Sequence, residues 1–171
     1  KRIENSKRKG GVGKNTKNIS LGASLEKKKK KILMLDIDPQ GNTTSGIGVS
    51  KRDLEYTVYD LLIEDNFDTK EAVIHTNIEN LDIVPVSVDL VGADIETVQL
   101  EGREARLRKA IEKVKDSYDY ILIDCPPSLG LLTINSLTAV QSVLIPIQCE
   151  FYALEGVSQL VSTIDLVKKS L

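Results

Sequence analysis

The chain has 171 residues, of which 41% are hydrophobic and 28% charged, as expected for one globular domain with a buried core. Aromatic residues make up only 4% with no Trp, which argues against a stacking platform for single-stranded nucleic acid, and no apolar run is long enough to span a membrane. The net charge of −2 is unevenly distributed. Residues 1–31 hold 12 Lys/Arg against two Glu, and the remainder holds 11 basic against 23 acidic residues. This asymmetry predicts a contact with phosphate or nucleic acid near the N-terminus, although the run Lys27–Lys31 alone is more typical of a solvated face.

Short apolar runs alternate with amphipathic segments along the chain. Runs of buried-strand length occur at 32–37, 81–86, 120–124 and 143–147. Helices are predicted at 14–26, 56–64, 69–75, 87–99, 102–116, 130–139 and 153–169, and a Gly/Ser/Thr-rich loop at 42–52. Because each strand is apolar on both faces, the pattern predicts a single α/β domain over residues 1–171. Its sheet is expected to be mostly parallel and twisted, with helices on both faces.

A phosphate-binding loop is predicted near the N-terminus, where three glycines and two lysines fall within six residues. Glycines let the backbone approach a ligand closely, and successive backbone N–H groups before a helix form a cradle for an anion. The predicted nucleotide-binding residues are Lys9, Gly10, Gly11, Val12, Gly13, Lys14, Asn15 and Thr16.

Acidic residues end two of the predicted strands. The run ILMLDID carries Asp36 and Asp38, and the run YILID ends in Asp124. In an open α/β sheet, ligands bind beyond the carboxyl ends of the strands. Carboxylates there, together with a lysine-bearing glycine loop, favour a magnesium nucleotide, in which the loop holds the phosphates and the acids hold the metal, often through water.

Four segments resemble one known family. KGGVGKNT, LDIDPQGN, ILIDCPPS and IPIQCEFYALEG follow in order and are similar to the deviant Walker A ATPases of the ParA/Soj type, within the ParA/MinD family. The resemblance covers nearly the whole chain. It implies a P-loop NTPase fold, Mg-ATP as cofactor and a role in chromosome or plasmid partition.

The resemblance also implies residue roles. Lys14 would contact the β- and γ-phosphates, and Lys9 would reach the nucleotide of a partner subunit in an ATP-sandwiched homodimer. Asp38 would orient the attacking water, and Asn15, Asp38 and Asp124 would form the metal site. Two switch regions would follow, the first shaped by Asp36, Pro39 and Gln40 and the second by Pro126, Pro127 and Ser128. Slow, partner-stimulated hydrolysis would then depend on dimerisation and on charge neutralisation by both lysines.

Family members are cytoplasmic and associate with the nucleoid. They bind DNA non-specifically as ATP dimers and respond to a centromere-binding, ParB-like partner. The resemblance therefore implies these partners for this chain, with no membrane involved.

The sequence departs from the family pattern in three places. Asn15 stands where the family has a magnesium-ligating Thr, and its amide lacks the hydroxyl donor. The strand before the loop should be apolar, yet Glu4, Asn5, Ser6 and Lys7 are polar and would cost several kcal/mol to bury, so a displaced strand is one expectation. The chain ends at Leu171, and we expect the C-terminal part of the family's fold to be absent.

Alternative functions remain open at this point. A MinD-type ATPase of the cell-division site shares the loop and the acids but acts at a membrane through a C-terminal amphipathic helix. A nucleotide-binding module with impaired hydrolysis is favoured by Asn15 and the polar first strand. An iron–sulfur ATPase of the nitrogenase iron-protein type needs bridging cysteines, which Cys125 and Cys149 do not match.

Overall fold

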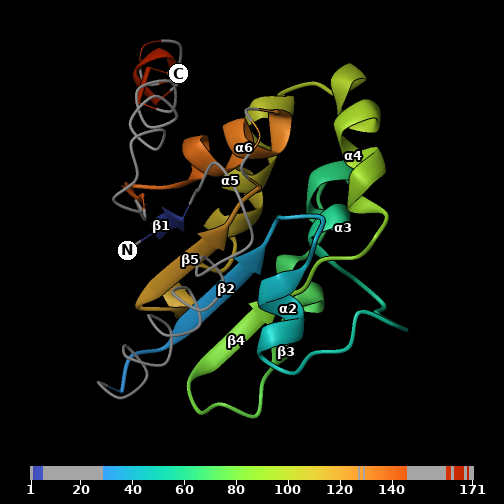
Figure 1. The fold of residues 1–171 in the computed structure, drawn as a ribbon, viewed down its shortest axis with the longest axis vertical. Helices are drawn as coiled ribbons and strands as arrows, with labels where there is room; N and C mark the ends of the chain where they lie inside the picture. Colours follow the sequence, from blue (N-terminus) through green and yellow to red (C-terminus); the bar gives the residue numbers. More distant parts are fainter. Residues whose placement is uncertain are drawn as a thin grey trace, which may run out of the picture.

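The computed structural model describes residues 2–5, 29–126, 128, 130–145, 161, 162, 164–167 and 169. These residues form a six-stranded sheet in the order β3-β4-β2-β5-β1-β6 (Figure 1). Every neighbouring pair in it is parallel except β3 with β4, so the predicted mostly parallel sheet is confirmed. The strands are β1 (Arg2–Asn5), β2 (Ile32–Asp36), β3 (Ile74–His75), β4 (Leu81–Val84), β5 (Tyr120–Asp124) and β6 (Ser142–Leu144).

The first strand is inside the sheet and is not displaced. β1 pairs with β5 through Arg2↔Ile121 to Asn5↔Asp124 and with β6 on its other side. A ladder of backbone hydrogen bonds does not depend on the identity of the side chains, so a polar sequence can occupy this position. The structure therefore places the end of β1 beside the end of β5.

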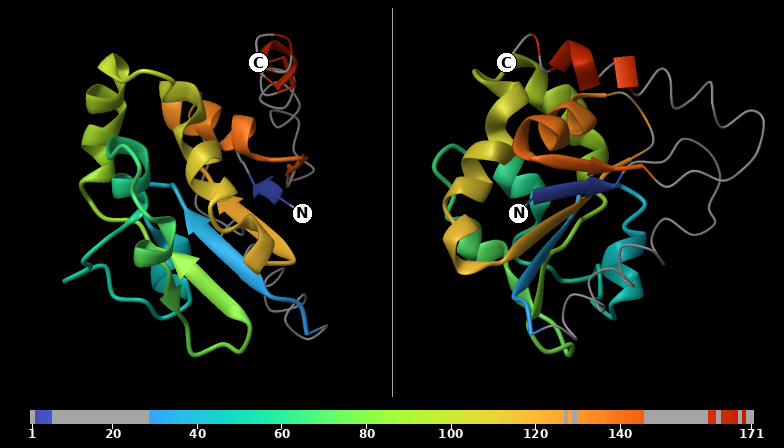
Figure 2. Two further views of the ribbon diagram at one scale, coloured as in Figure 1. Left: turned by 180° about the vertical axis from the view of Figure 1, so that it is seen from behind. Right: turned by 90° about the vertical axis from the view of Figure 1, so that its left-hand side faces the viewer.

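Five α-helices between residues 42 and 139 surround the sheet. They are α2 (Asn42–Gly46), α3 (Val58–Ile63), α4 (Leu90–Glu96), α5 (Arg106–Glu112) and α6 (Leu131–Ala139), with short 3-10 turns at Thr69–Ala72, Thr97–Gln99, Arg103–Ala105 and Lys115–Ser117. In the edge-on view of Figure 2, α3, α4 and α5 lie on one side of the sheet and α2 on the other. The described part of the predicted closing helix, at 161, 162, 164–167 and 169, is helical.

Alternating residues of the central strands contribute to two hydrophobic clusters. Leu33 and Leu35 of β2 face the larger cluster, which α3, α4, α5 and α6 complete. Ile32 and Met34 face a smaller one with residues of β4 and β5, closed by Ile47 after α2. Since successive residues of a strand point to opposite faces, a strand that is apolar throughout is buried on both.

Three predicted elements differ from the structure. Residues 42–46 form α2 instead of a loop, and the helix predicted at 69–75 is a 3-10 turn followed by β3, whose residues pair antiparallel with Ile83 and Asp82. The helix predicted at 102–116 is interrupted, because the side chain of Asn135 in α6 accepts a hydrogen bond from the Leu107 N–H at the start of α5 (3.1 Å) and donates one to the Arg103 carbonyl (2.7 Å). The predicted helix at 14–26 lies outside the described residues.

Candidate functional site

Three strands end together at one edge of the sheet. Asp36 and Asp124 are the last residues of β2 and β5, and they stand opposite each other in the register of this parallel pair. Asn5, the last residue of β1, is in register with Asp124 on the other side. Both carboxylates are buried, Asp36 completely and Asp124 to all but 2%. The predicted edge with two acids therefore exists, and the chain leaves β1 beside it.

Two consecutive threonines of α2 bind these two acids. The Thr43 hydroxyl donates to Oδ2 of Asp124 (2.7 Å). The backbone N–H and the hydroxyl of Thr44 both donate to Oδ2 of Asp36 (2.7 and 2.8 Å). The Thr44 hydroxyl also accepts a hydrogen bond from the N–H of Val86, beyond the end of β4 (3.3 Å). α2 is thereby fixed to the ends of three neighbouring strands.

Burial raises the pKa of the Asp36 carboxyl from 3.8 to about 6. The charge of Asp124 raises it further, while the hydrogen bonds from Thr44 and the Asp38 N–H act in the opposite direction and stabilise the carboxylate. Asp36 is therefore a buried acid that titrates near neutral pH and that hydrogen bonds keep in place.

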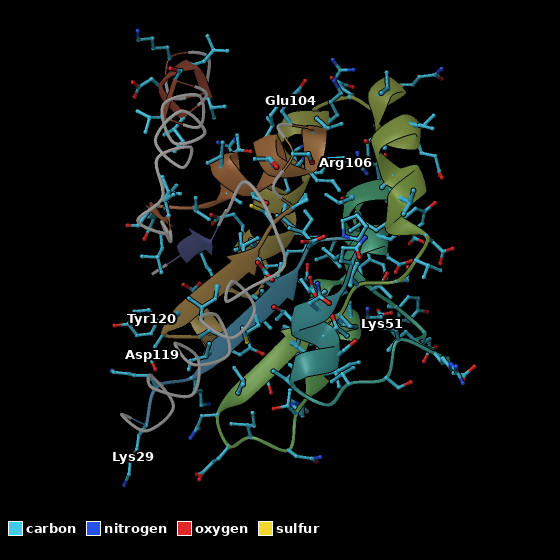
Figure 3. The ribbon with its side chains drawn as sticks, in the orientation of Figure 1. Lys29, Lys51, Glu104, Arg106, Asp119 and Tyr120 are labelled. Carbon is cyan, nitrogen blue, oxygen red and sulfur yellow. The ribbon has the colours of Figure 1, made fainter. Side chains whose placement is uncertain are left out.

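A tight turn follows β2 and carries Asp38. The Asp38 side chain, 8% exposed, accepts a hydrogen bond from the Gln40 N–H (3.1 Å), and the Asp38 carbonyl accepts one from the Gly41 N–H (2.8 Å). Gly41 has φ +60°, and a Cβ there would lie 2.5 Å from Cε of Lys51, whose ammonium donates to the Gln40 carbonyl (2.5 Å). Figure 3 shows Lys51 beside α2 at this turn. The positive φ favours glycine at this turn, and a Cβ would also lie 2.7 Å from Cγ1 of Val86.

The basic run before β2 lies at the opposite end of the strands. Asp119, just before β5, accepts a hydrogen bond from the Lys31 N–H (2.9 Å) and pairs with the Lys30 ammonium (3.3 Å). Lys29 and Asp119 lie in Figure 3 at the end of β2 and β5 away from α2. The described part of this run therefore lies at a distance from the acidic edge.

The predicted site residues fall into two groups. Asp38 and Asp124 lie at the described edge of the sheet. Lys9, Gly10, Gly11, Val12, Gly13, Lys14, Asn15 and Thr16 lie outside the described residues. In the second predicted switch region, the Thr133 hydroxyl of α6 donates to the Ser128 carbonyl (2.5 Å), and Pro127 is outside the described residues.

No group of three or more His, Cys, Asp or Glu among the described residues could hold a metal ion by itself. The described part of the chain also contains no helix long and apolar enough to cross a bilayer.

Three residues that build this edge are not predicted from the sequence: Thr43, Thr44 and Lys51. All three fall in a stretch that its Gly, Ser and Thr content predicts to be a loop. Asn42, Thr43 and Thr44 follow Gly41, and Asn and Thr are common at helix starts, but nothing in their spacing points to the acids that the threonines bind.

Comparison with known proteins decides the family. A family model described as an AAA domain matches residues 1–171, the whole chain. The chain belongs to this family. It is 57% identical over 163 residues to the sporulation initiation inhibitor protein Soj of Bacillus subtilis (strain 168), and 51% identical over 166 residues to the chromosome partitioning protein ParA of Myxococcus xanthus (strain DK1622). The predicted ParA/Soj type is therefore confirmed.

The matches cover nearly all of this chain but only part of each relative. They span 95% of the chain and 64% of Soj, and 97% of the chain and 58% of ParA. The chain thus covers less than two thirds of the length of these relatives.

Solved structures confirm the predicted fold. A cobyrinic acid a,c-diamide synthase from Mycobacterium smegmatis, crystallised with an ATP analogue and magnesium, matches with a TM-score of 0.91 and 38% identity over 98% of this chain and 68% of that protein. A plasmid partition protein from Borrelia burgdorferi B31, bound to AMPPNP, matches with a TM-score of 0.84 and 30% identity over 100% of this chain and 71% of that protein. The ParA/Soj-type chain therefore has a P-loop NTPase fold.

Proposed function

We propose that residues 1–171 act as one nucleotide-binding domain of a partition ATPase and bind Mg-ATP where β1, β2 and β5 end. The observation that carries this proposal is the edge itself. Asp36 and Asp124 are in register with each other at the ends of β2 and β5, and Thr43 and Thr44 donate hydrogen bonds to them. The end of β1 lies at the same edge, where Asn5 is in register with Asp124, and the glycine-rich segment follows β1 in the sequence. The ATP analogue and magnesium of the Mycobacterium smegmatis protein support the choice of ligand.

The residues present fit such a ligand by their chemistry. Lys14 and the glycines of 10–13 would supply a cation and backbone donors to the phosphates. Asp38 and Asp124 would hold the magnesium shell with Asn15, and Asp38 would also orient the attacking water. Bound Mg²⁺ would neutralise phosphate charge, and the chain's own residues would position the nucleotide.

The wider partition role belongs to the same proposal. Lys9 would contact the nucleotide of a second subunit, so that hydrolysis needs an ATP-dependent homodimer. The dimer would bind DNA non-specifically on the nucleoid and respond to a ParB-like centromere-binding protein. Support for these steps comes from the similarity to Soj and ParA.

Titration of the chain with a fluorescent ATP analogue, with and without Mg²⁺, tests the proposal. We expect saturable binding that Mg²⁺ strengthens and that Lys14→Ala weakens by at least about tenfold, about 1.4 kcal/mol. Lys27→Ala, a loss of the same charge outside the loop, is the matched control. Absence of saturable binding would refute both the enzyme and the binding module.

Asn15 supports a second candidate, a nucleotide-binding module with impaired hydrolysis. An amide oxygen can ligate Mg²⁺, but it lacks the proton of the threonine hydroxyl. In a phosphate-release assay, turnover in Asn15→Thr with none in the parent chain would favour this candidate. Equal turnover in both chains would favour an active ATPase that carries Asn15.

Lys9→Ala tests the role across the subunit interface. We expect this variant to bind the analogue as a monomer but not to dimerise with ATP in sedimentation velocity. Equal loss of monomer binding would contradict the assignment.

A further inference from the structure

An unusual row of apolar side chains lies exposed on and around α4. Val88, Val91, Ile95 and Val98 are 74%, 68%, 78% and 52% exposed. They recur at intervals of three, four and three residues. Val91, Ile95 and Val98 lie along one side of the helical segment from α4 through the turn Thr97–Gln99, and Val88 lies in the turn just before α4. We call these four residues the α4 ridge.

The opposite side of the same segment already packs against the protein. Leu90 and Ala93 are completely buried and Thr97 is 2% exposed, and Leu90 and Ala93 belong to the larger hydrophobic cluster with residues of α3. The Tyr59 hydroxyl of α3 donates to Oε2 of Glu96 (2.6 Å), which fixes how α4 lies on α3. Figure 1 shows α4 at the outer side of α3. The α4 ridge is therefore a second apolar side that the fold of the described residues does not need.

Acidic residues predominate around the ridge. Residues 71–102 contain seven Asp and Glu and no Lys or Arg. The guanidinium of Arg103 donates to the Val98 carbonyl at one end of the ridge (2.6 Å), and Glu104 pairs with it (2.9 Å). Asp89 and Glu96 lie in the helical segment itself, between ridge positions, and the exposed Glu101 follows it. A partner that covers the ridge must therefore bring apolar side chains at helical spacing together with positive charge at their flanks.

We propose that the α4 ridge binds a basic amphipathic helix of a partner protein. Apolar residues of that helix at intervals of three and four would pack along Val91 and Ile95, and its Lys or Arg residues would face Asp89 and Glu101. Symmetric pairing of two such ridges would place acidic residues of both copies near one another, and an anionic lipid surface would be repelled. The charge therefore selects a basic partner over a second copy or a membrane.

This inference is independent of the proposed nucleotide site, because it rests on exposure, spacing and charge around α4. An intact chain that fails to bind ATP would still be expected to bind such a helix. The two proposals can therefore fail separately.

The test uses the whole chain and a labelled peptide of about 18 residues, long enough for a helix, with Leu on one side and Lys on the other. We expect saturable binding by fluorescence anisotropy without nucleotide, weakened at least about tenfold in Val91→Ser/Ile95→Ser. Val161→Ser, at a residue 45% exposed in another helix, is the matched control and should bind as the parent does. The same peptide with Glu in place of Lys should not bind the parent chain, but it should bind Asp89→Lys/Glu101→Lys.

Several results would overturn the proposal. Equal binding by the ridge variant, or equal binding of the Glu and Lys peptides, would show that the ridge or its charge is irrelevant. Self-association of the parent chain that Val91→Ser/Ile95→Ser abolishes in sedimentation would assign the ridge to a second copy. Ridge-dependent co-sedimentation with phosphatidylglycerol vesicles would assign it to a membrane. Circular dichroism of each variant verifies that it is folded.

Discussion

Thr44→Val is the sharpest test of how the acidic edge is held together. Valine has nearly the shape of threonine, so the packing of this completely buried side chain is retained. The substitution removes the hydroxyl that donates to Asp36 (2.8 Å) and accepts from the Val86 N–H (3.3 Å). It leaves the Thr44 backbone bond to Asp36 in place.

The expected loss is the sum of two buried interactions. A hydrogen bond to a charged group contributes about 1.5–3 kcal/mol, and an unsatisfied buried N–H costs about 1 kcal/mol or more, so the free energy of unfolding should fall by about 2–4 kcal/mol at pH 7.5. The pKa of Asp36 is about 6. At pH 5 the carboxyl is therefore mostly protonated and the lost bond is weaker, so the deficit should shrink by about 1 kcal/mol.

Urea unfolding followed by circular dichroism measures both numbers, since the chain has no Trp for fluorescence. Thr44→Ser is the matched control, because it keeps the hydroxyl and loses only a methyl group, worth about 1 kcal/mol. A deficit of Thr44→Val no larger than that of Thr44→Ser at pH 7.5 would refute this reasoning. A deficit that does not change with pH would refute the part that concerns Asp36.

Three further predictions concern stability. The folded-state pKa of Asp36, about 6 against 3.8, means that the folded chain binds an extra proton between these values. Stability should therefore fall by about 2.4 kcal/mol as pH rises from 4 to 7, at about 1.4 kcal/mol per pKa unit. The urea midpoint of Asp36→Asn should not show this decline with pH. Identical dependence of the midpoint on pH in the variant and the parent chain would contradict the prediction. Thr57 and Asp60 form a capping box at the start of α3, so Thr57→Ala should lower the free energy of unfolding by about 1 kcal/mol. Ser117→Ala, which also removes a hydroxyl but at an exposed position, is the control and should change it little. Gly41→Ala should cost about 1–3 kcal/mol, because φ is +60° and the new Cβ would lie 2.7 Å from Cγ1 of Val86. If the contact with Val86 is the main cause, adding Lys51→Ala to Gly41→Ala will leave the loss of stability largely unchanged. Full recovery of stability in this double variant would show that the contact with Lys51 is the main cause.

The sheet could be predicted from the sequence because its central strands are buried on both faces. Ile32–Asp36 and Tyr120–Asp124 are continuous apolar runs that end in an acid, and their parallel pairing brings both acids to one edge. β3 could not be predicted in this way. Its two residues pair with β4 across a short connection, and their exposed or half-exposed side chains carry no pattern of burial.

Contacts between distant segments account for the remaining differences. The start of α5 is set by Asn135, 28 positions away from Leu107, and the position of α2 is set by acids on two strands. Local propensity depends on neighbouring residues and does not include these distant hydrogen-bond partners. The sequence around 42–52 therefore predicts a loop, and the sequence around 102–116 predicts one continuous helix. The acids were predictable from strand ends, whereas the threonines that bind them were not.

The chemistry of those threonines bears on what the edge can bind. Asp36 and Asp124 end adjacent strands in register, and the charge of Asp124 is one of the causes that raise the pKa of Asp36. A Lys or Arg at position 43 or 44 would also donate hydrogen bonds to the two carboxylates, but it would cancel their charge. Hydroxyl and backbone donors bind them without adding a positive charge. A divalent cation that arrives with a nucleotide would be attracted to the charge of these carboxylates.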